Sequence, residues 1–272
     1  MELAKRSLTY LALIAMAVFM LFPFIWMVST AVKPFGEIYT WPPRLIPHRW
    51  AFNNFPEAWK VAPFSRFFVN SFVVATVSTI MAVVLNSLSG YALAKYNFPG
   101  RNVLFFIVLS TLMIPFQVTM VPVFMTLSNM GLLNSYWGLI LPGTASAFGI
   151  FMMRQFLHTI PDELIDAARI DGSGEFGIYW RIILPLTKPA LAVLAIFTFM
   201  WRWNDFLWPL IVLDSEEMFT VQLGLSRFQG EYYVEWNYLM AMTLVSLIPM
   251  LVVFLLFQRY FVKGIAMTGM KG

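Results

Sequence analysis

A polar stretch at residues 158–188 separates two long apolar runs and holds the side chains best suited to contact another molecule. It reads HTIPDELIDAARIDGSGEFGIYWRIILPLTK. Thr159 is expected to cap a helix that has acidic residues in its first turn and Arg169 in its last, an order that suits the helix dipole. Gly172 is expected to end this helix, because glycine takes the left-handed conformation that a helix stop needs.

A second short helix is expected after this turn, with Ser173 as its cap and Glu175 in its first turn. Leu184 and Pro185 are expected to end it, because proline cannot continue a helix. Two short helices around a glycine turn, exposed between the apolar runs, have a shape for docking rather than for spanning a membrane. The stretch therefore predicts docking of a partner protein.

Sequence patterns of common catalytic and nucleotide-binding sites are absent. The chain has no GxxxxGK[ST], HExxH or GxSxG pattern, so neither a P-loop nor those hydrolase centres are expected. It has no cysteine, and its two histidines, His48 and His158, lie far apart and form no metal-ligand pattern. We therefore expect a chain that is not an enzyme and binds no metal or cofactor itself.

The segment FMWRWNDFLWPL places Arg202, Asn204 and Asp205 within an apolar run. Charged groups inside a membrane are costly and usually face a cavity or pair with each other. Asn204 and Asp205 are thus candidates for the translocation path or its outer gate. An interfacial belt is an equal alternative, in which the tryptophans of this segment lie among the headgroups and Arg202 extends toward water.

The composition predicts an all-α polytopic membrane protein. Of 272 residues, 60% are hydrophobic and 12% are charged, whereas soluble domains are about 45–50% apolar and about 25% charged. A span needs about 20 apolar residues, and the first run exceeds the apolar part of a secretory signal, so we expect it to be retained. Six helices in one domain, 1–272, are expected at 8–32, 67–95, 103–128, 137–157, 189–213 and 238–259.

The distribution of Lys and Arg predicts the orientation of these spans. Basic residues gather in the short loops of one side, which is the cytoplasmic side by the positive-inside rule, and both termini lie there. They are Lys5, Arg6, Lys95, Arg101, Arg154, Arg169, Arg181, Lys188, Arg259, Lys263 and Lys271. The long segment after the first run is also basic and argues weakly against this orientation.

Small and polar residues in the second run favour close packing of membrane helices, with a role in transport as the weaker alternative. They are Asn86, Ser87, Ser89 and Gly90. Prolines are expected to interrupt the third and sixth runs. They are Pro115, Pro122 and Pro249.

The stretch DAARIDG at residues 166–172, followed by ILP and Pro189, closely resembles the EAA motif of permease subunits of binding-protein-dependent ABC importers. The one departure is Asp166, where that family usually has Glu. YALAKYNFPGR, WNDFLWPL and the C-terminal FQRYFVKGIAMTGMKG extend the likeness over nearly the whole chain, to the maltose-type permeases of the carbohydrate-uptake branch.

The resemblance implies a type I ABC importer permease fold in a bacterial or archaeal cytoplasmic membrane. It implies a heterodimer with a second, homologous permease, two ATPase subunits that carry ATP and Mg²⁺, an extracytoplasmic binding protein and a sugar-like solute; no nucleic acid partner is expected. The residues that would form the coupling helix on the ATPase are Asp166, Ala167, Ala168, Asp171, Gly172 and Pro185. The tail, residues 263–272, would reach toward the ATPase interface.

Tyr232, Tyr233 and Trp236 resemble the part of an outer loop that meets the binding protein, with an interfacial anchor as an equal alternative. The same machinery for a glycerophosphodiester or polyol stays open, because the coupling stretch carries no information on cargo. A stand-alone secondary carrier is less favoured, since carboxylates are scarce within the runs. A scaffold or receptor, with no solute flux, is a third class.

Overall fold

The computed structural model describes residues 2–230 and 232–269, with side chains placed for 6–230 and 232–258. This part of the chain is helical, as predicted; it contains no strand and one isolated bridge, between Gln229 and Val234. The chain divides into two compact units. The first unit comprises Met1–Ser65 and Gly224–Ile248, and the second comprises Arg66–Leu223 and Pro249–Gly272.

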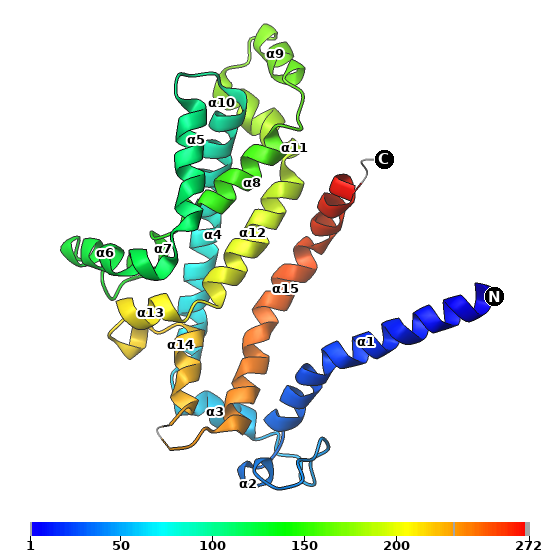
Figure 1. The fold of residues 1–272 in the computed structure, drawn as a ribbon. Helices are drawn as coiled ribbons and strands as arrows, with labels where there is room; N and C mark the ends of the chain where they lie inside the picture. The colour runs from blue at the N-terminus through cyan, green and yellow to red at the C-terminus, as the bar shows by residue number, and fades with distance from the viewer. Residues whose placement is uncertain (1, 231, 270–272) are drawn as a thin grey trace. The chain divides into compact units, whose positions relative to one another are not determined.

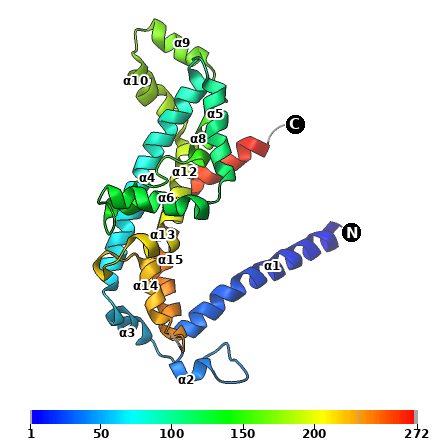
Figure 2. The ribbon, with the colours of Figure 1, turned by 60° about the vertical axis from the view of Figure 1, so that its left-hand side comes forward.

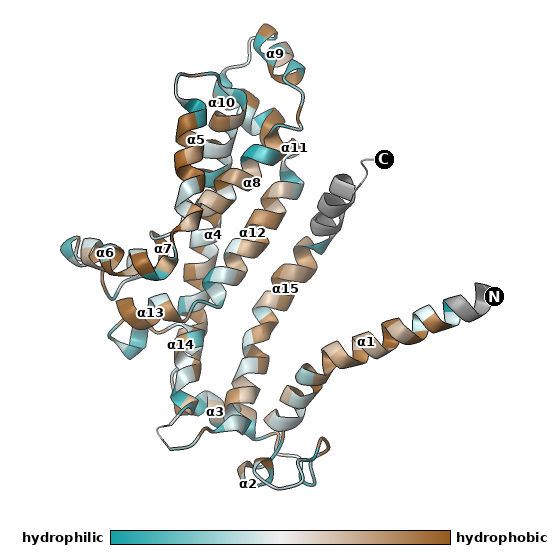
Figure 3. Ribbon diagram, in the orientation of Figure 1, coloured by the Kyte–Doolittle hydropathy of each residue, from teal (hydrophilic) through white to brown (hydrophobic). Residues whose placement is uncertain are grey.

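Helices α4, α5, α8 and α12 lie side by side in the second unit (Figure 1). Figure 3 shows apolar residues along α5, α8 and α12 and a mixture of polar and apolar residues on α9. The helices from α4 to α13 are α4 (Phe64–Lys95), α5 (Arg101–Ser110), α6 (Phe116–Asn129), α7 (Tyr136–Ile140), α8 (Ala147–Leu157), α9 (Glu163–Ile170), α10 (Glu175–Ile178), α11 (Leu184–Leu186), α12 (Lys188–Trp203) and α13 (Leu207–Val212).

Three helices of the described part are long and apolar enough to cross a membrane, at Arg6–Ala31, Phe64–Lys95 and Trp236–Gln258. Two further candidates are bent pairs: Arg101–Met113 meets Phe116–Asn129 at 103°, and Glu175–Leu186 meets Lys188–Trp203 at 78°. Figure 2 shows α6 turned away from the axis of α5. The fourth predicted run is divided between α7 and α8. Three to five candidate spans are therefore found, and the number six stays a prediction.

Proline explains one of these breaks and not others. Pro115 precedes α6 with an extended backbone, ψ 140°, and has no N–H to donate to the preceding turn. Pro122 and Pro249 lie inside α6 and α15 (Trp236–Gly269), which continue through them. The predicted interruption of the third run is confirmed at Pro115, whereas the helices continue through the other two prolines.

The polar residues of α4 support the backbone at these breaks. Asn86 is fully buried, donates to the carbonyls of Ala82 (2.7 Å) and Thr144 (3.2 Å), and accepts from the Ser146 amide (2.8 Å) between α7 and α8. One turn further on, a Cβ added to Gly90 would lie 2.6 Å from the Met153 Cβ, so only glycine lets α4 approach α8 this closely. Both positions have a packing role, as the favoured interpretation predicts.

In the first unit, one asparagine joins three segments. Helices α1 (Glu2–Ala31), α2 (Phe35–Ile38) and α3 (Asn54–Val61) belong here, with η4 (Ser226–Phe228) and the start of α15. Asn54 donates to the carbonyls of Ala31 and Lys33, both at 2.8 Å, and accepts from Asn237 of α15 at 3.2 Å. The end of α1 is thereby capped by a side chain rather than by water.

Candidate functional site

Helix α9 ends in the predicted glycine turn. Gly172 has φ +81°, its amide donates to the Arg169 carbonyl at 3.0 Å, and the Ser173 amide donates to the Ala168 carbonyl at 2.9 Å. These two bonds form a Schellman motif, which satisfies carbonyls that a helix end would otherwise leave unpaired. The predicted helix stop at Asp171 and Gly172 is confirmed.

The predicted helix caps are wrong in detail. The helix α9 begins at Glu163 after Asp162, because the Thr159 hydroxyl donates to the Phe156 carbonyl (2.7 Å) in the turn that follows α8. The helix α10 begins after Gly174, and Ser173 lies one residue earlier, in the Schellman motif that ends α9. Hydroxyl residues near a helix start have competing local partners, and sequence alone does not rank them.

The second helix also continues past the predicted end. A π-helical turn, Tyr179–Ile183, widens the helix ahead of Pro185, which then falls in the first turn of α11, where a missing N–H costs least. The chain turns at Thr187 instead, whose hydroxyl donates to the Ile183 carbonyl at 3.0 Å. The expected end at Leu184 and Pro185 is therefore corrected to Leu186.

Ion pairs hold α9 and α10 together around the turn. Arg169 Nε lies 2.8 Å from Glu175 Oε1, and Arg169 Nη1 lies 3.2 Å from Asp166 Oδ1. The Tyr96 hydroxyl, from the α4–α5 loop, donates to Glu175 Oε2 at 2.5 Å. Burial and then this hydrogen bond raise the pKa of Tyr96, which keeps the phenol protonated as a donor. The turn is thus tied to α4 as well as within itself.

A second tie lies at the start of α9. Lys95, at the end of α4, lies 2.5 Å from Asp162 Oδ1 with its side chain only 4% exposed, and it also donates to the Ile160 carbonyl. Beneath it, Ile165 and Ala168 pack into one apolar cluster with residues of α4, α8 and α12. Residues 158–188 are therefore bound to the rest of the second unit through both polar and apolar contacts.

The outer face of this segment combines carboxylates with large apolar side chains. Ile170 is 87% exposed and Phe176 is 76% exposed, one on each side of the Gly172 turn. Asp166, Ala167, Asp171, Gly172 and Pro185 are also exposed, whereas Ala168 is buried. Helix α9 lies at one end of the second unit (Figure 1). An apolar pair rimmed by carboxylates is typical of a protein-docking surface.

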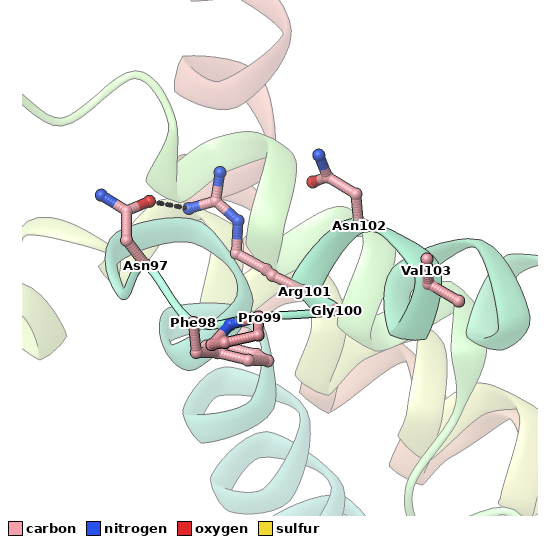
Figure 4. Close-up of a pocket in the computed structure, with 7 residues that line it drawn as sticks. All are labelled: Asn97, Phe98, Pro99, Gly100, Arg101, Asn102 and Val103. Atoms are coloured by element: carbon pink, nitrogen blue, oxygen red, sulfur yellow. Dashed lines mark hydrogen bonds between the residues drawn. The ribbon is translucent and has the colours of Figure 1, made fainter.

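The loop between α4 and α5 lies next to this surface. A shallow hollow of 430 Å³ is lined by residues 97–103, and Figure 4 shows Arg101 reaching back to Asn97. Arg101 Nη1 donates to the Asn97 side chain at 2.8 Å and to the Tyr96 carbonyl at 3.1 Å. The loop that carries Tyr96 is thereby held in shape by its own arginine.

The candidates for the translocation path lie where α12 ends. Asn204 is exposed, donates to the Met200 carbonyl (2.9 Å) and accepts from Gln222 (3.2 Å). Asp205 is partly buried and accepts from the Trp208 amide at 3.2 Å, at the start of α13. These bonds give both residues a local structural role, and a role in the path stays a prediction.

The interfacial-belt alternative fits Trp201, which is 53% exposed, and is wrong for the rest of this segment. Trp203 and Trp208 are 1% and 2% exposed, and the Trp208 indole donates to the Gly138 carbonyl at 3.0 Å. Arg202 donates through Nη2 to the Pro142 carbonyl between α7 and α8, so it does not extend toward water. Together with Asn86, this arginine supplies partners to backbone groups that the broken fourth run leaves without helical ones.

The aromatic residues of the second predicted site belong to the first unit. Tyr232 and Tyr233 are exposed, and the Tyr233 ring meets Phe35 edge-on with centroids 6.0 Å apart. Trp236 lies in the first turn of α15. Residues 270–272 of the predicted tail lie outside the described residues, and 263–269 are described as helix without side chains. Among the described residues, no group of His, Cys, Asp or Glu could hold a metal ion.

Comparison with known proteins decides the family. Residues 82–267, which include all of residues 158–188, match the model of the binding-protein-dependent transport system inner membrane component family. The chain belongs to this family. This permease is 40% identical over 207 residues to the arabinooligosaccharides transport system permease protein AraQ of Bacillus subtilis, covering 76% of this chain and 74% of that protein.

A second relative is named for a different cargo. The sn-glycerol-3-phosphate transport system permease protein UgpE of Yersinia pestis is 37% identical over 264 residues, 94% of each chain. A solved bacterial ABC transporter involved in the import of the acidic polysaccharide alginate has a chain with the same fold, at TM-score 0.83 and 24% identity, covering 95% of this chain and 96% of that one. The predicted ABC importer permease fold is thus confirmed.

Sequence analysis missed two residues of the site. Lys95 was predicted only as a cytoplasmic basic residue and, with Tyr96, as part of the YALAKYNFPGR loop, yet the two residues bind Asp162 before α9 and Glu175 after it. Their distance in sequence from Asp162 and Glu175 hides the contact. The one available signal is a lysine directly after a long apolar run, which must find a partner or reach water.

Proposed function

We propose that this permease forms half of the pathway for a sugar and is driven by a separate ATPase that docks on residues 158–188. The observation that carries this proposal is the exposed pair of Ile170 and Phe176 on a segment bound firmly to the transmembrane helices. A flexible loop could bind the ATPase but would not transmit its movement. A segment held by ion pairs and an apolar cluster moves together with α4, α8 and α12.

The coupling is a population shift. Closure of the ATPase dimer on ATP would favour the outward-facing pore if only that state fits the closed dimer. Asp166, Asp171 and Gly172 would shape the surface that enters the ATPase, while Ala168 faces inward and packs. In this proposal the chain itself binds no nucleotide, and ATP and Mg²⁺ would bind the partner ATPase.

The proposed assembly contains a second homologous permease, two ATPase subunits and an extracytoplasmic binding protein. Six spans with both termini in the cytoplasm form one domain, with the bent pairs each counted as one crossing and the divided run 137–157 counted as the sixth. Asn204 and Asp205 would line the pathway near its outer end. Tyr232, Tyr233 and Trp236 would meet the binding protein, which the exposure of the first two supports.

A sugar is the favoured cargo, and one observation favours a second candidate. AraQ is named for arabinooligosaccharides and the solved neighbour for alginate, which supports a saccharide. UgpE is named for sn-glycerol 3-phosphate and matches over more of the chain, which supports a polyol phosphate as the alternative. All three cargoes are polyhydroxylated.

The proposal is tested in proteoliposomes with labelled arabinooligosaccharides, alginate oligomers and sn-glycerol 3-phosphate. Partner permease, ATPase and binding protein are each included or left out in turn. Uptake that needs all four proteins, and ATP on the ATPase side, is the expected result and identifies the cargo. Flux through this chain alone would overturn the proposal in favour of a stand-alone carrier.

A further inference from the structure

The first unit contains a pocket that the coupling proposal does not use. It has a volume of 370 Å³ and lies between the last turns of α1, the segment around α2 and the first turns of α15. Small-molecule sites commonly measure roughly 300–1,000 Å³, so one small solute fits. Its chemistry is set by three aromatic and three charged residues. They are Trp26, Tyr39, Trp236, Lys33, Glu37 and Arg44.

The charged residues of the pocket are built into the fold. Lys33 is only 3% exposed, and its ammonium lies 4.8 Å from the Trp26 ring centroid and donates to the Arg44 carbonyl. An ammonium has three donors, so Lys33 keeps capacity for a ligand. Glu37 Oε1 accepts from the His48 amide at 2.8 Å. Its second oxygen accepts no hydrogen bond from any residue that the structure describes, and a ligand hydroxyl could donate to it.

The aromatic residues are held in place beside these charges. The Tyr39 hydroxyl donates to the Val234 carbonyl at 2.8 Å, and its ring meets Phe35 edge-on at 5.4 Å. Trp236 lines the pocket from α15 and is part exposed. Aromatic faces carry partial negative charge and attract the polarised C–H groups of a sugar ring or polyol chain, while its hydroxyls need charged donors and acceptors.

We propose that this pocket binds a polyhydroxylated solute, a sugar or a polyol, at the outer side of the permease. The inference rests on the proposed function and adds a solute site on this chain. Two cations, Lys33 and Arg44, and one carboxylate, Glu37, line the pocket, so an acidic or phosphorylated member binds more tightly than a neutral one. A glycerophospholipid headgroup shares this chemistry, and the experiment separates the two sources.

The test measures binding by calorimetry, with the full chain in nanodiscs of phosphatidylcholine. Arabinooligosaccharides, alginate oligomers and sn-glycerol 3-phosphate are titrated, and a parallel series adds phosphatidylglycerol to the discs. One equivalent of a soluble ligand is expected to bind. Trp236→Phe is expected to weaken binding about two- to tenfold, the value of one aromatic contact. The control Trp50→Phe, in the same unit but outside the pocket, is expected to bind as the wild type does.

Three results would overturn the pocket. In the first, no soluble ligand binds. In the second, Trp236→Phe and the wild type bind with equal affinity. In the third, soluble ligands no longer bind when phosphatidylglycerol is present, which would mark a lipid site. Uptake by the four-protein system is measured on the same variants. Uptake that still needs all four proteins, without binding to this chain, would overturn the pocket and leave the proposed function intact.

Discussion

At the residue scale, residues 158–188 show for which side chains a sequence predicts the role. Gly172 was predictable because one backbone angle, φ +81°, decides its identity. The caps at Thr159 and Ser173 were not, because both residues belong to the turns that end the preceding helices, and the helices begin after Asp162 and Gly174. Lys95 and Tyr96 required the tertiary structure, since their partners lie more than 60 residues away. Local conformation is thus readable from the sequence, and choice of partner is not.

Gly172 is therefore the residue for the first prediction. A Cβ there meets no atom within 4 Å, so any effect of substitution comes from the left-handed backbone and not from crowding. Gly172→Val is expected to strain the turn by about 1–2 kcal/mol and to reduce ATP-driven uptake severalfold. Gly172→Asn is expected to retain most activity, because Asn tolerates this conformation.

Gly174 provides the matched control two residues further on. A Cβ there also meets no atom within 4 Å, and its φ is −70°, a value that any residue adopts. Gly174→Val is expected to transport as the wild type does. Wild-type uptake by Gly172→Val, with the ATPase bound normally, would contradict the role of the turn in coupling.

At the element scale, apolar runs predicted the existence of membrane helices better than their continuity. The run at 67–95 is one helix, α4, whereas those at 103–128, 137–157 and 189–213 are each broken. Hydropathy reflects the transfer of side chains from water into the membrane. It takes no account of backbone N–H and C=O groups that lose their hydrogen-bond partners in the helix. The breaks persist because buried polar side chains replace those partners, as Asn86 and Arg202 do between α7 and α8.

The second prediction concerns Asn86. Replacing it with Leu removes the acceptor for the partly buried Ser146 amide and the donor to the buried Thr144 carbonyl, at a cost of about 1–3 kcal/mol for each group left unpaired. The midpoint of thermal unfolding of the purified protein is expected to fall. Asn102→Leu makes the same chemical change at an exposed position in the first turn of α5 and is the control. Equal midpoints for the two variants would show that Asn86 does not hold the break.

At the scale of the whole molecule, the open question is how many times the chain crosses the membrane. Family and fold are shown by the comparisons, while lengths and composition alone allow three to five candidate spans in the described residues. Charge distribution favours six, since the basic ends Lys95, Arg101 and Lys188 belong to the same set of short loops. The bent segment 101–129 and the divided run 137–157 decide whether the number of crossings is odd or even, because a re-entrant path would return to its starting side.

The last prediction uses the absence of cysteine from the chain, which makes every introduced cysteine a unique label. Ile46→Cys, Ile170→Cys and Tyr232→Cys are exposed positions. Three predicted spans separate the first from the second and one separates the second from the third. A membrane-impermeant maleimide is expected to label the Ile46 and Tyr232 variants only in right-side-out vesicles and the Ile170 variant only in inside-out vesicles. Labelling of the Ile46 and Ile170 variants from the same side would mean that one of the two broken runs between them, 101–129 or 137–157, does not cross the membrane. The positive-inside argument would then fail for one of the two loops, and the coupling surface at Gly172 would have to be placed anew.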